Sequence, residues 1–175
     1  MNITIFRRRF TPWGVDGTLV INGVIFSGTL EHPYNYLPAG DYVIISLPLK
    51  FKKKIEVVVK KKHHKKEKVF KTKIVEEYKN MPVIHKEEHG FISPLAGKPY
   101  ITAGSGPLAL KHGSIVMGKS LMTGLVAYDE KLFQKFCKKI DELSDGKEMI
   151  DLHIKYLGKE EIPLKYLAFF PGKVL

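Results

Sequence analysis

The chain has 175 residues, of which 44% are hydrophobic and 11% are aromatic. That length and composition favour one folded domain with a buried core. The sequence holds no window of about 18 apolar residues, which excludes a membrane-spanning helix. The N-terminal residues lead into Arg7-Arg8-Arg9 without an apolar segment, so we expect no secretory signal. A single cysteine, Cys137, excludes an intramolecular disulfide and is typical of a reducing compartment or of a particle assembled in one.

The formal net charge of +11 is concentrated in one stretch of the sequence. Twelve lysines lie between Lys50 and Lys73, where only Glu56 and Glu67 oppose them. This stretch therefore carries a net charge of +10, and the rest of the chain is nearly neutral at +1. Such a distribution predicts a basic appendage on an otherwise neutral domain.

Short runs of alternating apolar residues, separated by Gly, Pro and Asn, predict antiparallel strands in the first half of the chain. We expect the first strand at residues 3–6. Residues 17–21 and 24–26 are expected to pair across Asn22-Gly23, because Asn and Gly tolerate the positive φ of a type I′ turn. A further strand is expected at 41–45, after the turn residues Pro38-Ala39-Gly40.

The lysine-rich stretch has the pattern of a hairpin. Residues 54–59 and 69–75 are rich in β-branched side chains, and the nine residues between them are all Lys, His or Glu. This pattern predicts a long hairpin insertion at residues 50–78 with a basic tip. The alternative is a solvated lysine loop, because like charges repel one another. The candidate residues for binding an anion or a nucleic acid are Lys60, Lys61, Lys62, Lys65, Lys66 and Lys68.

One helix is expected, from Glu130 to Leu143, with Asp129 as its N-cap. Its apolar stripe consists of Leu132, Phe133, Phe136, Cys137, Ile140 and Leu143. Because Cys137 lies on this stripe, we interpret it as a core residue and not as a nucleophile. A final strand is expected at 150–156, and the apolar residues 166–170 are expected to pack on another surface.

Together these elements predict a mostly β fold of the α+β class. We expect a single domain over residues 1–175, built as a compact antiparallel or barrel-like sheet with one C-terminal helix. The basic hairpin at 50–78 is then an insertion in that domain.

Residues 113–120 match the phosphate-loop pattern G-x-x-x-x-G-K-[ST]. A phosphate-binding loop must curl between a strand and a helix, whereas Ile115-Val116-Met117 favours an extended strand and Leu121-Met122-Thr123-Gly124 is a poor helix start. We therefore expect a strand here and no nucleotide cofactor.

His85-Lys86-Glu87-Glu88-His89 matches the H-x-x-E-H zinc motif, which works only on a helix. Pro82 and Gly90 leave little room for one, so we interpret these histidines as surface residues near a strand end, and we expect no metal site. His63-His64 lies among lysines, whose charge opposes a bound cation.

Several motifs occur in the order found in a small phage-associated family of β-rich domains of uncertain function. They are Gly17-Thr18-Leu19, Thr29-Leu30-Glu31, Leu37-Pro38-Ala39-Gly40-Asp41-Tyr42, residues 101–105 and residues 113–118, followed by the helix. The chain resembles this family over residues 7 to 157, and the lysine hairpin has no counterpart in the family pattern. The resemblance implies a phage-type protein on a β-rich scaffold.

The later motifs are also similar, more remotely, to the H…S-H-G-C signature of L,D-transpeptidases, which act on peptidoglycan. In that resemblance Ser114 stands at the position of the nucleophilic cysteine, Thr102 at that of the histidine base, and His112 at that of the second histidine. A serine hydroxyl needs a general base, and threonine cannot be one. The resemblance therefore implies a degenerate active site.

Two functional hypotheses follow. The first is a non-enzymatic, virion-associated structural protein, in the phage particle or the host cytoplasm, acting in assembly with other copies or subunits. Its lysine hairpin would contact an acidic partner: nucleic acid, another subunit or an anionic cell-wall polymer. The alternative is a peptidoglycan-acting enzyme of the L,D-transpeptidase type, with Ser114 as nucleophile and His112 as base.

Overall fold

The computed structural model describes residues 1–59, 69–106, 113–144 and 150–157. The chain forms two compact units, of which the first consists of Met1–Ser46 with Met81–Leu175 and the second of Leu47–Asn80. The expected insertion at 50–78 falls within the second unit. Its predicted tip, including all six candidate lysines from Lys60 to Lys68, lies outside the described residues.

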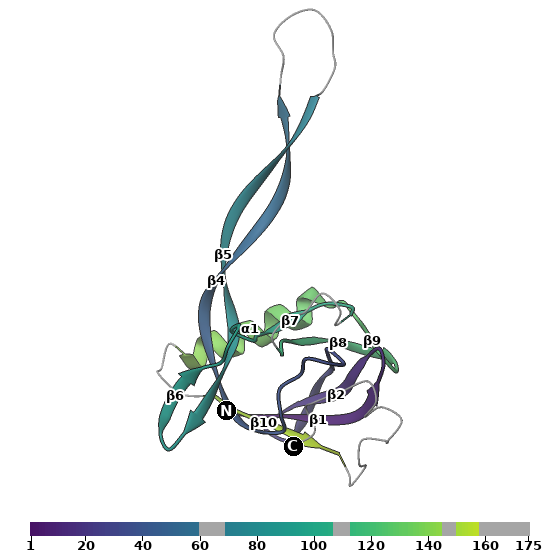
Figure 1. Ribbon diagram of the computed structural model, residues 1–175, viewed down its shortest axis with the longest axis vertical. Helices are drawn as coiled ribbons and strands as arrows, with labels where there is room; N and C mark the ends of the chain where they lie inside the picture. The colour runs from purple at the N-terminus through teal and green to yellow at the C-terminus, as the bar shows by residue number, and fades with distance from the viewer. Residues whose placement is uncertain (60–68, 107–112, 145–149, 158–175) are drawn as a thin grey trace, which may run out of the picture. The chain divides into compact units, whose positions relative to one another are not determined.

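The described residues form ten strands and one helix (Figure 1), which confirms the prediction of a mostly β fold with one helix near the C-terminus. The strands are β1 (Asn2–Thr11), β2 (Gly14–Ile21), β3 (Val24–Glu31), β4 (Gly40–Val59), β5 (Val69–Glu88), β6 (Phe91–Pro94), β7 (Ile101–Ala103), β8 (Ile115–Met122), β9 (Leu125–Ala127) and β10 (Ile150–Tyr156), and the helix is α1 (Glu130–Ser144). They pair in the order β6-β5-β4-β10-β1-β2-β3-β8-β7, and β9 pairs with β8. No described helix is long and apolar enough to cross a membrane.

The sheet is largely antiparallel but contains two parallel pairs, β1 with β10 and β7 with β8. Parallel neighbours need a long connection between them, because the chain must return to the starting edge before it pairs again. The β7–β8 connection and the whole chain between β1 and β10 supply these returns. The alternation of apolar residues along each strand could not show that these two pairs are parallel and not the antiparallel partners of a hairpin.

The ladder of strands is open, yet its two ends approach one another within the first unit. Val83 of β5 forms an isolated antiparallel bridge with Tyr100, the residue before β7. The Ile84 amide also donates to the Pro99 carbonyl, with an N···O distance of 2.8 Å. These contacts place the residues before β7, at one end of the ladder, beside β5 near its other end.

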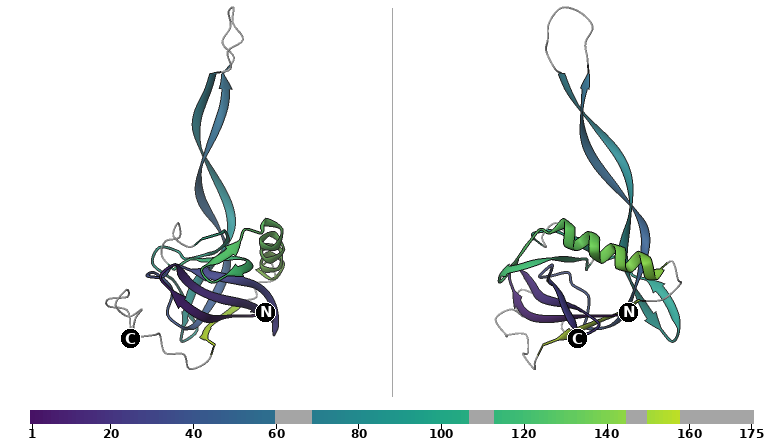
Figure 2. Two further views of the ribbon diagram at one scale, coloured as in Figure 1. Left: turned by 90° about the vertical axis from the view of Figure 1, so that its right-hand side faces the viewer. Right: turned by 180° about the vertical axis from the view of Figure 1, so that it is seen from behind.

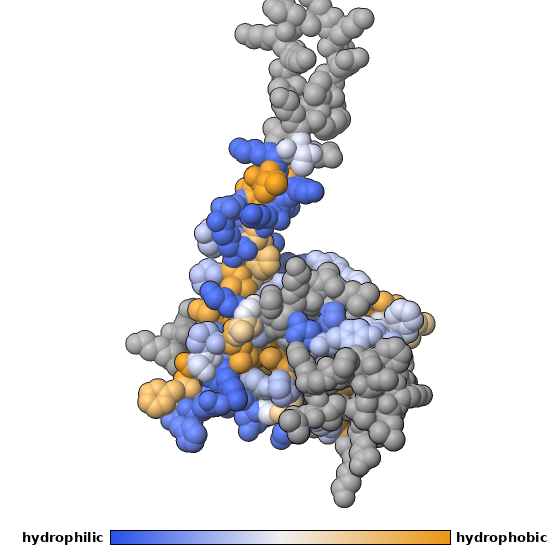
Figure 3. All heavy atoms as spheres, in the orientation of Figure 1, coloured by the Kyte–Doolittle hydropathy of each residue, from blue (hydrophilic) through white to orange (hydrophobic). Residues whose placement is uncertain are grey.

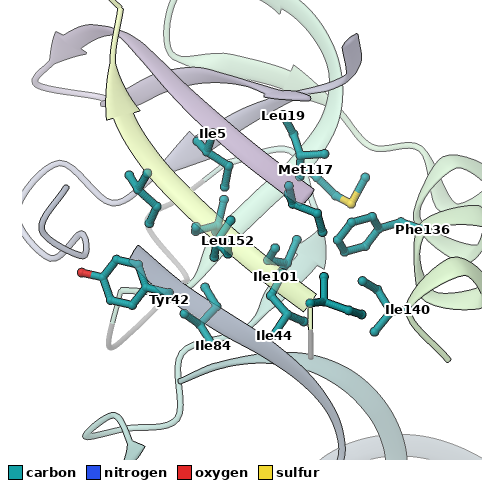
Figure 4. Close-up of a cluster of buried hydrophobic side chains, with 14 of the residues drawn as sticks. Ile5, Leu19, Tyr42, Ile44, Ile84, Ile101, Met117, Phe136, Ile140 and Leu152 are labelled. Carbon is teal, nitrogen blue, oxygen red and sulfur yellow. The ribbon is translucent and has the colours of Figure 1, made fainter. Parts of the chain in front are cut away.

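The core lies on the inner face of the curved sheet. Figure 4 shows side chains from β1, β2, β4, β5, β7, β8, β10 and α1 pointing toward one another. Phe136 and Ile140 of α1 are fully buried there, and α1 packs against β7, β8 and β10 (Figure 2). The stripe predicted for the helix is therefore the face that covers the core.

Two short-range predictions are confirmed in detail. Asn22 and Gly23 have φ values of 48° and 83°, both positive, as a type I′ turn requires. Asp129 is the N-cap of α1, since its Oδ1 accepts a hydrogen bond from the Leu132 amide at 2.9 Å.

The second half of β8 leaves the main sheet and forms, with β9, a small second layer. A side chain at Gly118 would place its Cβ 2.2 Å from the Ala127 carbonyl oxygen, and one at Gly28 would come within 3.0 Å of the Ser120 Cβ. The two glycines therefore allow β8 to fold closely over β3. Val126 then packs on Leu30 and Val116 in a separate buried cluster. We call residues 119–127 the flap.

Candidate functional site

Ser114, which corresponds to the transpeptidase nucleophile in the resemblance, lies immediately before β8 and is only 2% exposed. Its Oγ accepts a hydrogen bond from the Tyr100 amide at 3.2 Å. The next amide, Ile115, donates to the Tyr100 carbonyl at 2.9 Å. The serine side chain therefore extends the parallel ladder between β7 and β8, which is a structural use of the hydroxyl.

The structure does not bring a base to Ser114 within the residues it describes. Thr102 pairs with Val116, two positions beyond Ser114, so the two residues are offset by about 7 Å along the strands. The Thr102 hydroxyl donates to the Ala103 carbonyl at 3.3 Å. His112, the proposed base, lies outside the described residues.

A buried ion pair that the sequence analysis did not identify joins β1 to β3. Arg7 and Glu31 are fully buried, with Nε–Oε1 and Nη2–Oε2 distances of 2.9 and 2.7 Å. Arg7 Nη2 also donates to the Leu37 carbonyl at 2.5 Å. Burial by itself lowers the pKa of Arg7, but the charge and hydrogen bonds of Glu31, together with those of Tyr156, outweigh it, so the pKa is raised and the guanidinium stays charged.

Aromatic rings complete the surroundings of this ion pair. The Arg7 guanidinium carbon lies 4.9 Å from the Tyr36 ring centroid and 5.8 Å from that of Tyr156. Phe10 contacts both tyrosines, with centroid distances of 5.7 and 5.6 Å. Burial raises the pKa of Tyr36, so the phenol remains neutral beside the cation. Stacking of this kind holds a guanidinium in a fixed plane.

The ion pair connects three of the motifs on which the family resemblance rests. Glu31 ends the T-L-E motif, and Leu37 begins the L-P-A-G-D-Y motif. The Tyr42 hydroxyl donates to the Pro38 carbonyl at 2.9 Å and holds the same loop. Gly113 has φ of +74°, and a Cβ there would lie 3.0 Å from the Leu37 side chain. These motif residues therefore have a shared structural role, which is to seat the loop before β4 against the start of β8.

Gly17 of β2 allows the neighbouring strands to approach closely, since a Cβ there would come within 2.4 Å of the Thr29 Oγ1 and 3.0 Å of the Phe6 carbonyl oxygen. One signal for the buried pair was present in the sequence. Arg7 continues the inward alternation of Ile3 and Ile5, and both of those residues are fully buried. The run Arg7-Arg8-Arg9 was noted only as the end of an N-terminal stretch without an apolar segment, so this alternation was not used.

The phosphate-loop match and the zinc-motif match both fall mostly on strands. Residues 115–120 of the phosphate-loop match belong to strand β8, as expected. His85 lies on β5 and His89, with φ of 53°, follows that strand in a turn. The interpretation of both histidines as surface residues was wrong for His85, which is 7% exposed because β5 turns this side chain inward. In the part of the chain that the structure describes, no three His, Cys, Asp or Glu side chains are grouped to hold a metal ion.

Cys137 is half-buried on α1. Burial, followed by the negative charges of Asp141 and Glu130, raises its pKa to about 12. The thiol is therefore protonated at neutral pH, which is unfavourable for a nucleophile.

The described part of the hairpin carries an excess of exposed lysines. Lys50 pairs with Glu76 at 2.7 Å, and Lys79 lies 3.8 Å from Glu77. Four other lysines are exposed: Lys52, Lys53 and Lys54 of β4 and Lys73 of β5. None of the four forms a salt bridge with another side chain that the structure describes. Figure 3 shows mainly hydrophilic side chains along this part of β4 and β5, interrupted by hydrophobic ones.

Comparisons of the chain with protein-family models, with curated proteins and with solved structures found no match.

Proposed function

We propose that the protein is a non-enzymatic, phage-type structural component that contacts an acidic partner through its lysine hairpin. The observation that carries this proposal is the segregation of charge between the two compact units. The Leu47–Asn80 unit holds thirteen lysines and four glutamates, a net +9 of the chain's +11, which leaves +2 on the larger remainder. If the positive charge served only to keep the protein soluble, it would not need to be concentrated in about one fifth of the chain.

The exposed lysines of the hairpin favour long-range electrostatic attraction of an acidic partner over recognition of a specific sequence or shape. Lys52, Lys53 and Lys54 are consecutive in β4 and therefore alternate between the two faces of the ribbon. Lysine is a point charge on a flexible stem, so it attracts phosphate or carboxylate without reading a geometry. We therefore expect binding that is independent of sequence and strongly weakened by salt.

Binding to a short DNA duplex at several salt concentrations tests the proposal. Replacing Lys52, Lys53 and Lys54 by Gln should weaken binding and reduce the slope of log K against log[salt] by up to ~2.7. A matched control replaces three exposed lysines of α1, Lys131, Lys135 and Lys139, by Gln. Polyglutamate in place of DNA distinguishes a nucleic-acid partner from an acidic protein. Equal losses in the two triple variants, or binding that survives high salt, would contradict the hairpin's role.

The association with a phage particle needs its own test. Mass spectrometry of purified particles from cells producing the protein should detect it at a fixed copy number. Recovery from the soluble lysate alone would exclude a virion component.

The alternative, catalysis by Ser114, is less favoured because the Ser114 hydroxyl is buried and already accepts a hydrogen bond from the Tyr100 amide. Peptidoglycan turnover by the wild type, abolished by Ser114→Ala but kept by Thr102→Val, would reverse this preference.

A further inference from the structure

The tip of the flap is tied to the hairpin formed by β1 and β2. The Gly124 amide donates to both carboxylate oxygens of Asp16, at 2.9 and 3.0 Å. Arg9 Nη1 donates to the Thr123 hydroxyl at 2.9 Å. A Cβ on Gly124 would lie 3.0 Å from the Cβ of Trp13, so the flap tip and the turn form one continuous surface.

This anchored surface nevertheless exposes large apolar side chains. Trp13 is 68% exposed, and Met122 and Leu125, which pair across the flap tip, are 67% and 38% exposed. Leu121 beside them is 58% exposed. We call these four residues the flap surface. Clustered apolar side chains on an otherwise well-anchored element mark a place where another segment packs.

The end of β10 directs the chain toward this surface. β10 runs parallel to β1, and the Leu157 amide still donates to the Arg7 carbonyl at 2.8 Å. From Arg7 along β1 to Trp13, in the turn that follows this strand, is at most about 20 Å. Phe169 follows Leu157 by twelve residues, which can span up to about 40 Å, so the C-terminal segment is long enough to reach the flap surface.

The composition of that segment matches the path in order. Arg8 and Arg9 are exposed and lie between the end of β10 and Trp13. Glu160 and Glu161 come soon after Leu157 in the sequence, and the apolar residues 166–170 follow them. We propose that residues 158–170 of the same chain dock on the flap surface, with the two glutamates beside Arg8 and Arg9 and the aromatic residues on Trp13 and Met122.

Trp13 is the only tryptophan of the chain, so its fluorescence reports on this surface directly. The test compares acrylamide quenching of the full-length wild type with that of Phe169→Ser/Phe170→Ser. Loss of two buried phenylalanines should lower the ratio of docked to undocked molecules by at least roughly a hundredfold. Emission should then shift to longer wavelength and quenching should increase. A control variant, Tyr78→Ser/Phe91→Ser, removes two exposed aromatic residues from elsewhere and should leave Trp13 unchanged.

The reciprocal change on the flap, Met122→Glu, should expose Trp13 in the same way while leaving the tail intact. Trp13 that is quenched equally in the wild type and in both variants would overturn the proposal. Shielding that increases with protein concentration would overturn it too, because a second copy would then be the occupant.

Discussion

The buried pair of Arg7 and Glu31 supports a prediction about stability. Replacing Glu31 by Leu leaves the guanidinium of Arg7 buried without its counter-ion and without two charge-assisted hydrogen bonds. Loss of one partner from a buried pair costs about 3–5 kcal/mol. Since a domain of this size is stable by roughly 5–15 kcal/mol, the variant should lose a large part of its free energy of unfolding.

Removing both charges should cost much less than removing one. In Arg7→Met/Glu31→Leu no unpaired charge remains, and the main loss is the donor to the Leu37 carbonyl, worth about 1–3 kcal/mol. The double variant should therefore be more stable than Glu31→Leu alone. Urea unfolding followed by circular dichroism measures the free energies of unfolding of the wild type, Arg7→Met, Glu31→Leu and the double variant, and these four form a coupling cycle.

The exposed pair of Lys138 and Glu142, 3.7 Å apart on α1, serves as the control. Glu142→Gln should change the free energy of unfolding by less than about 0.5 kcal/mol. If Glu31→Leu costs no more than this control, or if the double variant is the least stable of the three, the reasoning about the buried charge is refuted.

Three further predictions concern single side chains. Ser114→Ala should lower the free energy of unfolding by about 0.5–1.5 kcal/mol, because the half-buried Tyr100 amide loses the Ser114 hydroxyl as acceptor, and urea unfolding measures this; no loss would contradict the structural role of the hydroxyl. Gly118→Ala should displace β9, seen as faster hydrogen exchange at Val126, whereas Gly106→Ala, whose added Cβ meets nothing within 4 Å, should not. Cys137, with its pKa raised to about 12, should react slowly with a disulfide reagent at pH 8, and its rate should go on rising about tenfold per pH unit toward that value; a rate that levels off just above pH 9 would contradict the shift. Because the folded-state pKa is the higher one, the protonated thiol's contribution to stability is complete below pH 9 and is lost as the pH rises toward 12.

Much of the local structure could be predicted because its signals lie close together in the sequence. The Asn22-Gly23 turn, the Asp129 cap and the strand at 150–156 each depend on neighbouring residues alone. The same holds for the helix, whose buried Phe136 and Ile140 are four positions apart. The candidate site could not be assessed in this way, because burial of Ser114 depends on β7, which the sequence analysis did not predict as a strand.

The sequence by itself determined that the domain is mostly β with one amphipathic helix, and that its charge belongs to one short stretch, since composition and periodicity are local properties. Tertiary structure alone decided that β1 lies parallel to β10, that β8 folds over at Gly118, and that Arg7 is a buried partner of Glu31 and not a surface cation. The physical reason is common to all three. Each depends on which distant segment occupies the neighbouring position, and a strand pattern indicates that a partner exists without indicating which one.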